Sequence, residues 1–104
     1  MYASIRIRKE YFEVLKQLGD VNAIAESAIR KYVIDLLIKR IEISKKEVNQ
    51  FEKKYSCDYT TFAERISDVV KSNPTWEEDF IEWEYWSKEL QEWTKRLENT
   101  LLKL

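Results

Sequence analysis

Few side chains of this 104-residue sequence could support metal or nucleophilic chemistry. Glu78 and Glu82 stand four residues apart, a spacing that places two carboxylates on one helical face, where they could in principle bind a metal ion. The sequence contains no His, so neither a carboxylate–histidine site nor a catalytic Cys–His pair built on Cys57 can form. With one Gly, the sequence also lacks the glycines of a phosphate-binding loop. It therefore predicts no enzyme activity, no metal and no cofactor, and places both Glu on a solvated face.

Chemistry of another kind, hydrogen bonding to nucleic-acid bases, is suggested by the alternating residues SIRIR at positions 4–8. An extended chain points successive side chains to opposite sides, so Ile5 and Ile7 share one side. The other side carries Tyr2, Ser4, Arg6 and Arg8. This alternation predicts a short strand at residues 3–7 with one apolar face.

The predicted strand needs a partner, because backbone N–H and C=O groups do not stay unpaired in a folded core. The segment RIEIS at residues 40–44 is the weaker candidate, since it lies within a sustained helical pattern. The favoured partner is the same strand of a second chain, which would form a two-stranded antiparallel ribbon in a homodimer. Such a ribbon fits the DNA major groove, where Arg can pair with guanine. The alternative is an ordinary edge strand or a disordered lead-in.

The elements that would position this strand are helical. Apolar residues recur at helical spacing over residues 9–18, and Gly19 is expected to end that helix in a left-handed conformation. Asp20 or Asn22 can then cap a second helix by accepting a backbone N–H. A short helix followed by a longer one is therefore predicted directly after the strand.

The second helix is expected to be long. Its apolar stripe runs almost continuously from Ile24 to Ile41, and no Gly or Pro interrupts the chain before Tyr55. Ser44 and Glu47 could form a capping box that restarts the helix. A continuous or gently broken helix is favoured over a full break.

Two further helices are expected in the C-terminal half. Asp58 can cap the first, and Asn73-Pro74 should end it, because a residue before proline disfavours the α conformation. Thr75 and Glu78 form a capping box that opens the last helix. The apolar stripe of that helix includes Trp76, Phe80, Trp83, Trp86, Leu90, Trp93 and Leu97.

Residues 2–37 resemble the ribbon-helix-helix family of DNA-binding proteins, which has the Arc/MetJ-like fold. The matching segments are SIRI, the amphipathic KEYFEVLKQL, the turn GDVN and the helix AIAESAIRKYVIDLL. The resemblance implies a dimer whose ribbon reads double-stranded DNA in the major groove. By position, the base-reading residues are Tyr2, Ser4 and Arg6. The resemblance also implies that the N-terminus of the second helix anchors a DNA phosphate through free N–H groups. That end consists of Asp20, Val21 and Asn22.

Two positions depart from the family pattern, and a third does not favour the phosphate contact. Arg8 stands where the family often has Pro or Ser, so it is expected to contact a phosphate rather than bases. Asn22 stands where Ser or Thr is common. Asp20 would be mildly unfavourable next to a phosphate, because both groups are negatively charged.

Charge divides the chain into two parts. Residues 1–46 hold ten Lys and Arg against six Asp and Glu, a net charge of +4, whereas residues 47–104 hold eight against thirteen, a net charge of −5. The segment WEEDFIEWEYWSKELQEW at residues 76–93 contains all four Trp, and seven acidic residues against one Lys. A basic front and an acidic back predict different partners for the two halves, and ordinary solvated surface is the alternative.

The last helix is apolar on two sides. Ile81 and Tyr85 fall on the side opposite Trp83, and a helix of this kind tends to be buried by more than its own chain. Trp and Tyr also dominate interface hot spots. The predicted partner-binding residues are Trp76, Phe80, Ile81, Trp83, Tyr85, Trp86 and Trp93. The alternative is a hairpin or coiled coil that packs these residues within the chain.

The sequence thus predicts a mainly α chain: a ribbon-helix-helix module at residues 1–43, with one short intermolecular strand and two helices, then a helical arm at residues 44–104. This layout resembles antitoxins of toxin–antitoxin modules, which implies repression of the module's own promoter and an arm that binds a toxin, often a basic nuclease. A protein-interaction hairpin without DNA binding and a stand-alone repressor are the alternatives. One Cys and the lack of a long apolar run or signal-peptide pattern indicate a cytoplasmic protein without a membrane partner.

Overall fold

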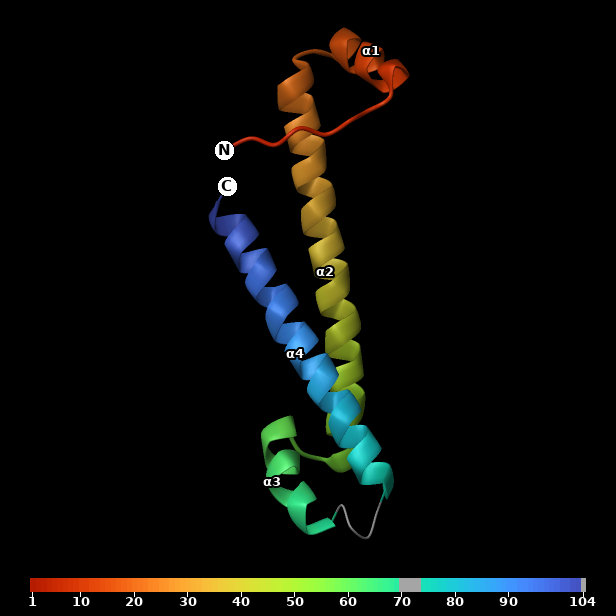
Figure 1. Cartoon of the computed structure of the whole chain (residues 1–104), viewed down its shortest axis with the longest axis vertical. Coiled ribbons are helices and arrows are strands. Elements are labelled where there is room, and N and C mark those ends of the chain that lie inside the picture. The colour runs from red at the N-terminus through yellow and green to blue at the C-terminus, as the bar shows by residue number, and fades with distance from the viewer. Residues whose placement is uncertain (70–73, 104) are drawn as a thin grey trace. The chain divides into compact units, whose positions relative to one another are not determined.

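The computed structural model describes residues 1–69 and 74–103, and these residues form four helices (Figure 1). The helices are α1 (Lys9–Leu18), α2 (Val21–Tyr55), α3 (Tyr59–Val69) and α4 (Pro74–Leu102). No strand occurs among the described residues. The expectation of a mainly α chain is therefore confirmed, whereas the ribbon-helix-helix fold with its N-terminal strand is wrong.

The predicted strand does not form, because no segment in the described part of the chain pairs with it. Residues 1–8 precede α1 without regular structure, and Ile5 and Ile7, expected to face a core, are exposed. Residues 40–44, the other alternating segment, lie inside α2, where their backbone groups bond along the helix instead. Alternation describes the faces that a strand would have, but a strand exists only when its backbone groups find a partner.

The chain divides into two compact units, Met1–Ile34 and Asp35–Leu104. We call them the N-terminal unit and the C-terminal unit. The division falls within α2, so one helix contributes residues to both units. The predicted functional boundary after Ile43 lies in the same helix and stays a prediction.

The turn of the N-terminal unit follows from two residues. Gly19 ends α1 with a φ of 150°, a backbone conformation that side chains disfavour, and its N–H donates to the carbonyl of Leu15 at 3.1 Å. Its ψ of −144° differs from that of the expected left-handed cap. The Asp20 carboxylate then accepts the N–H of Ala23 at 3.1 Å, which identifies Asp20 rather than Asn22 as the cap of α2.

Helix α2 is continuous for 35 residues, as the absence of Gly and Pro predicts. The capping box at Ser44 and Glu47 does not form. The Ser44 hydroxyl is buried, with 1% of the residue exposed, and it donates to the carbonyl of Arg40 one turn earlier at 3.0 Å. The serine thus satisfies its hydroxyl within the helix, and no break is needed there.

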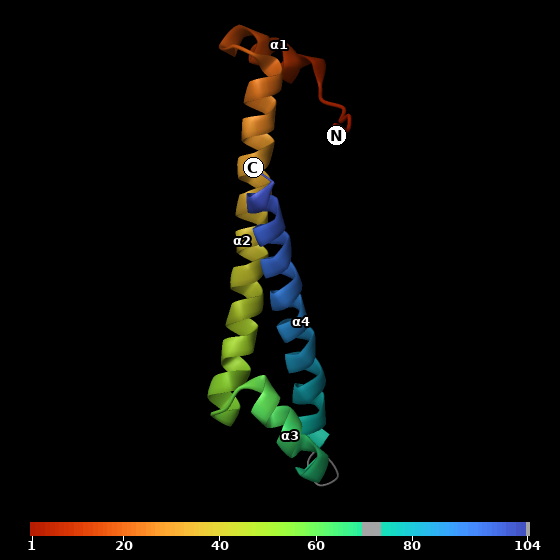
Figure 2. The same cartoon turned by 90° about the vertical axis from the view of Figure 1, so that its left-hand side faces the viewer.

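In the C-terminal unit, α4 runs antiparallel to the later part of α2, and α3 packs against α4 (Figures 1 and 2). The Asp58 carboxylate caps α3 by accepting the N–H of Thr61 at 2.8 Å, as predicted. The predicted end of α3 at Asn73 lies outside the described residues. Helix α4 begins at Pro74, one residue before the predicted cap at Thr75, because proline fits the first turn of a helix.

Candidate protein-interaction surfaces

The C-terminal unit is held together by an aromatic core. Its buried members come from all three helices: Phe51 on α2, Phe62 and Ile66 on α3, and Trp83 on α4. Trp83 has no exposed surface and packs on the rings of Phe51 and Phe62 at centroid distances of 5.7 and 5.1 Å. Around this core pack Tyr55, Cys57, Tyr59, Trp76, Phe80 and Trp86. Stacked and edge-on contacts of this kind add to the free energy gained from burying the rings.

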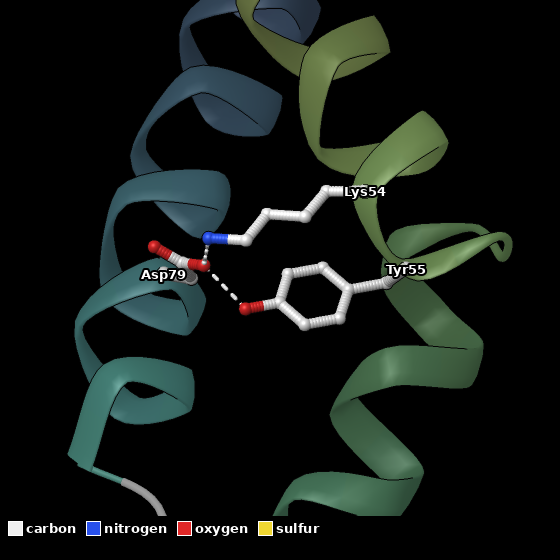
Figure 3. Close-up of polar contacts among 3 residues, drawn as sticks. All are labelled: Lys54, Tyr55 and Asp79. Atoms are coloured by element: carbon white, nitrogen blue, oxygen red, sulfur yellow. Dashed lines mark hydrogen bonds and ion pairs between the residues drawn. The ribbon is translucent and has the colours of Figure 1, made fainter.

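A polar contact joins α2 to α4 beside the core (Figure 3). One carboxylate oxygen of Asp79 accepts a hydrogen bond from the Tyr55 hydroxyl and a charged one from the Lys54 ammonium, the latter at 2.6 Å. Asp79 is largely buried, whereas the Lys54 side chain is half exposed. We call these three residues the helix clamp. It fixes the register of α2 against α4 by joining two residues, Tyr55 and Asp79, that are 24 positions apart in the sequence.

The helix clamp perturbs two pKa values. Burial, and then the hydrogen bond and negative charge of Asp79, raise the pKa of Tyr55 above its ordinary value, so the tyrosine stays neutral. Burial also raises the pKa of Asp79, but the hydrogen bonds from Lys54 and Tyr55 and the charge of Lys54 lower it by more. The pKa of Asp79 is therefore below its ordinary value, and the carboxylate stays charged.

Trp93 forms a second contact between α2 and α4. Its indole N–H donates to Glu89 one turn earlier at 2.7 Å, and its ring meets the guanidinium groups of Arg96 and Arg40, at 4.5 and 5.7 Å from the centroid. Arg40 belongs to α2, so this cation–π contact crosses between the helices. Trp93 thus has an intrachain role in the half-buried part of the hairpin.

The structure separates the seven predicted partner-binding residues into two groups. Four belong to the aromatic core or pack against it: Trp76, Phe80, Trp83 and Trp86. Trp93 is engaged by two arginines, as above. Ile81 and Tyr85 lie on the opposite face of α4, with 62% and 55% of their surface exposed. Packing within the chain, the alternative interpretation, thus involves all four tryptophans, and the partner-binding role of the set stays a prediction.

The N-terminal unit has a different character, because none of its residues, all of which are described, is buried. Its half-buried residues include Leu15, Ile24 and Ile34. Its exposed large apolar residues are Met1, Tyr2, Ile5, Ile7, Tyr11, Phe12, Val14, Leu18, Ile29, Tyr32 and Val33. We call these residues the N-terminal apolar surface.

The predicted DNA-binding residues all belong to this unit. Along residues 1–8, the side chains of Tyr2, Ser4, Arg6 and Arg8 are exposed. At the start of α2, Asn22 is exposed and Val21 is half buried. The Asp20 carboxylate already occupies this helix end by accepting the N–H of Ala23, so it places a negative charge where a phosphate was expected.

The sequence did not predict the helix clamp. Lys54 and Tyr55 end one helix, and Asp79 lies in the first turns of another, so no local pattern connects them. A weak signal existed: an aspartate among aromatic residues on the core side of α4 needs a partner when it is buried. Glu78 and Glu82, by contrast, are exposed, and no cluster of three potential metal-ligating side chains occurs in the parts of the chain that the structure describes.

Comparisons with protein-family models, with curated proteins and with solved structures find no match to this chain. A search of the described residues finds no helix that is long and apolar enough to cross a membrane.

Proposed function

We propose that the protein is a homodimeric DNA-binding transcriptional regulator whose C-terminal helical arm binds a second protein, the arrangement of an antitoxin that represses its own promoter. The observation that carries this proposal is the contrast between the units. The N-terminal unit has no buried residue and an apolar surface, whereas the C-terminal unit has its own aromatic core. The first needs a second chain to fold stably, and the second can serve as a preformed arm.

The size of the N-terminal apolar surface supports the homodimer. Its eleven side chains include four aromatic rings, and most members are about half exposed. Side chains of this size present on the order of 80 Å² each in that state, or roughly 900 Å² together. A stable interface removes about 800 Å² from each partner. A second copy of the chain is a suitable partner, because it carries the same apolar surface and is always present at the same concentration.

Charge supports a nucleic-acid partner for this unit. The N-terminal unit, residues 1–34, holds six Lys and Arg against four Asp and Glu, a net charge of +2, and Arg6, Arg8 and Lys9 are exposed at its N-terminal end. A dimer doubles this charge, and clustered Lys and Arg bind DNA phosphates by displacing counterions. Arg6 and Arg8 also carry planar donor groups that can pair with guanine edges. The lone thiol Cys57 accords with the cytoplasm as the place of action.

A protein-interaction module without DNA binding is the second candidate. The Asp20 cap favours it, because its negative charge opposes a phosphate at the start of α2. In that case the N-terminal apolar surface would bind a second copy of the chain, and the exposed Ile81 and Tyr85 of α4 would bind another protein.

Binding to a labelled duplex taken from upstream of the protein's own reading frame separates the two candidates. We expect tighter binding to this duplex than to an unrelated one, and Arg6→Ala should weaken it by about 1–3 kcal/mol. Lys95→Ala, which removes an exposed charge from α4, is the matched control and should leave binding unchanged. Equal affinity for both duplexes, with no effect of Arg6→Ala, would reject DNA recognition and favour the interaction module.

A further inference from the structure

An exposed apolar pair interrupts the outer face of α4. Ile81 and Tyr85 are adjacent on this face at i and i+4, and both are more than half exposed although Trp83 between them in sequence is fully buried. We call the two residues the α4 outer patch. Because the core of the C-terminal unit lies on the opposite side of the helix, the fold of this chain does not require these two side chains to be apolar.

Acidic residues surround the α4 outer patch. Glu77 and Glu78 stand four and three residues before Ile81, Glu82 stands three residues before Tyr85, and all three are exposed. The basic residue one turn after Tyr85 is Lys88, which is already paired with Glu84 at 2.9 Å. The patch is thus an apolar centre with a negatively charged rim.

The patch is also preorganised. The Tyr85 ring meets the Trp86 ring edge-on at a centroid distance of 5.1 Å, and Trp86 packs against the aromatic core. The backbone beneath it is fixed by the buried Trp83 and, nearer the start of α4, by Asp79 of the helix clamp. An exposed aromatic ring that is already held in place loses little conformational entropy on binding, which is typical of interface hot spots.

We propose that the α4 outer patch docks a basic amphipathic helix of a partner protein. The apolar face of that helix covers Ile81 and Tyr85, while flanking Lys or Arg side chains pair with Glu77, Glu78 and Glu82. Opposite charges around an apolar centre select the partner and speed its association. This inference rests on the partner-binding role of the arm in the proposed function, but not on DNA binding.

A synthetic amphipathic helix of about 18 residues, with Leu on one face and Lys on the other, provides the probe. Binding to the full-length protein is followed by fluorescence anisotropy of the labelled peptide. We expect Ile81→Ser combined with Tyr85→Ser to weaken binding at least about tenfold. The matched control is Leu101→Ser with Leu102→Ser, which alters two exposed apolar residues at the end of the same helix and should change binding less than about twofold.

Two further comparisons test the charge and the apolar centre separately. Changing Glu77, Glu78 and Glu82 together to Gln should weaken binding and reduce its dependence on salt. A peptide that keeps its Lys residues but has Ser in place of Leu should bind at least about tenfold more weakly. The proposal is overturned if this polar peptide binds as tightly as the original, or if the Ile81 and Tyr85 variant binds normally.

A second copy of this chain is the competing occupant, and sedimentation of the unliganded protein tests it. If the Ile81 and Tyr85 substitutions lower the mass of the assembly, the patch is a contact between copies and the proposal fails. Failure of the proposed function is distinguishable, because loss of DNA recognition affects only the duplex experiment. Peptide binding that persists without DNA recognition would support the patch while rejecting the regulator.

Discussion

Asp79 contributes directly to the pairing of α2 and α4, because its carboxylate accepts hydrogen bonds from two residues of α2. Asp79→Asn keeps the shape but removes the charge that pairs with Lys54 and weakens the bond from Tyr55. We expect the free energy of unfolding to fall by about 1–3 kcal/mol, as measured by urea denaturation at neutral pH. Glu92→Gln, which breaks the exposed ion pair with Arg96, is the control and should change stability by less than about 1 kcal/mol.

Acid should weaken the fold through the same carboxylate. The folded-state pKa of Asp79 lies below its ordinary value of about 3.9, so its contribution is present above that pH and is lost as the pH falls further. The stability advantage of the wild type over Asp79→Asn should therefore shrink between about pH 5 and pH 2. An advantage that stays constant over this range would contradict the assignment.

Alkali should act through Tyr55. Its folded-state pKa is raised above the ordinary value of about 10, so its contribution is present below pH 10 and is lost as the pH rises above that value. Tyr55→Phe should be less stable than the wild type at neutral pH and should lose less stability above about pH 10. Denaturation midpoints measured at neutral and alkaline pH for the two proteins check this. If both proteins lost the same stability at alkaline pH, the Tyr55 hydroxyl would not be the group whose ionisation weakens the fold.

At the scale of the element, the turn between α1 and α2 depends on the backbone of Gly19. A methyl group there would meet the Cδ1 atom of Ile24 at 3.4 Å, an ordinary contact, so the strain of Gly19→Ala would come from its φ of 150°. We expect a loss of about 1 kcal/mol, which speeds amide exchange in α1 roughly fivefold. Gln17→Ala, inside α1, is the control and should leave exchange nearly unchanged.

The helices could be predicted from the sequence because their signals are local. Asp58 caps the N–H of Thr61 three residues away, and Gly19 ends a helix through its own backbone. The single proline likewise marks the first turn of α4. Each signal acts within one turn of the chain, so composition and spacing reveal it.

The candidate site could be predicted only in part. The position of Ile81 and Tyr85 opposite Trp83 follows from helical periodicity. In the structure these two residues are exposed, whereas Trp83, which was expected to bind the partner with them, is buried. The helix clamp and the aromatic core depend on contacts between side chains of different helices, which the periodicity of a single helix does not encode. The strand failed for the same reason, since its existence depends on a remote partner rather than on its own alternation.

At the scale of the whole molecule, the proposed homodimer should depend on the N-terminal apolar surface. Tyr32 is exposed on α2, so Tyr32→Glu removes little packing within the chain but should place a charge in the contact between chains. We expect the wild type to sediment as a dimer at micromolar concentration and the variant to dissociate at least about tenfold more readily. Tyr85→Glu, similarly exposed but on α4, is the control and should leave the dimer intact. A wild-type protein that sediments as a monomer at tens of micromolar would reject the dimer.

The uneven distribution of burial between the two units also affects how the chain is made. A ribosome releases residues 1–34, which have no buried side chain, before residues 51–86, which form the aromatic core. The core joins segments close in sequence, so it can close soon after it emerges. The N-terminal apolar surface, in contrast, is exposed to solvent throughout synthesis, and in the proposed homodimer only a second chain covers it. Neighbouring nascent chains on one messenger would supply a second copy earliest, and chaperones would compete for the same surface until it is covered.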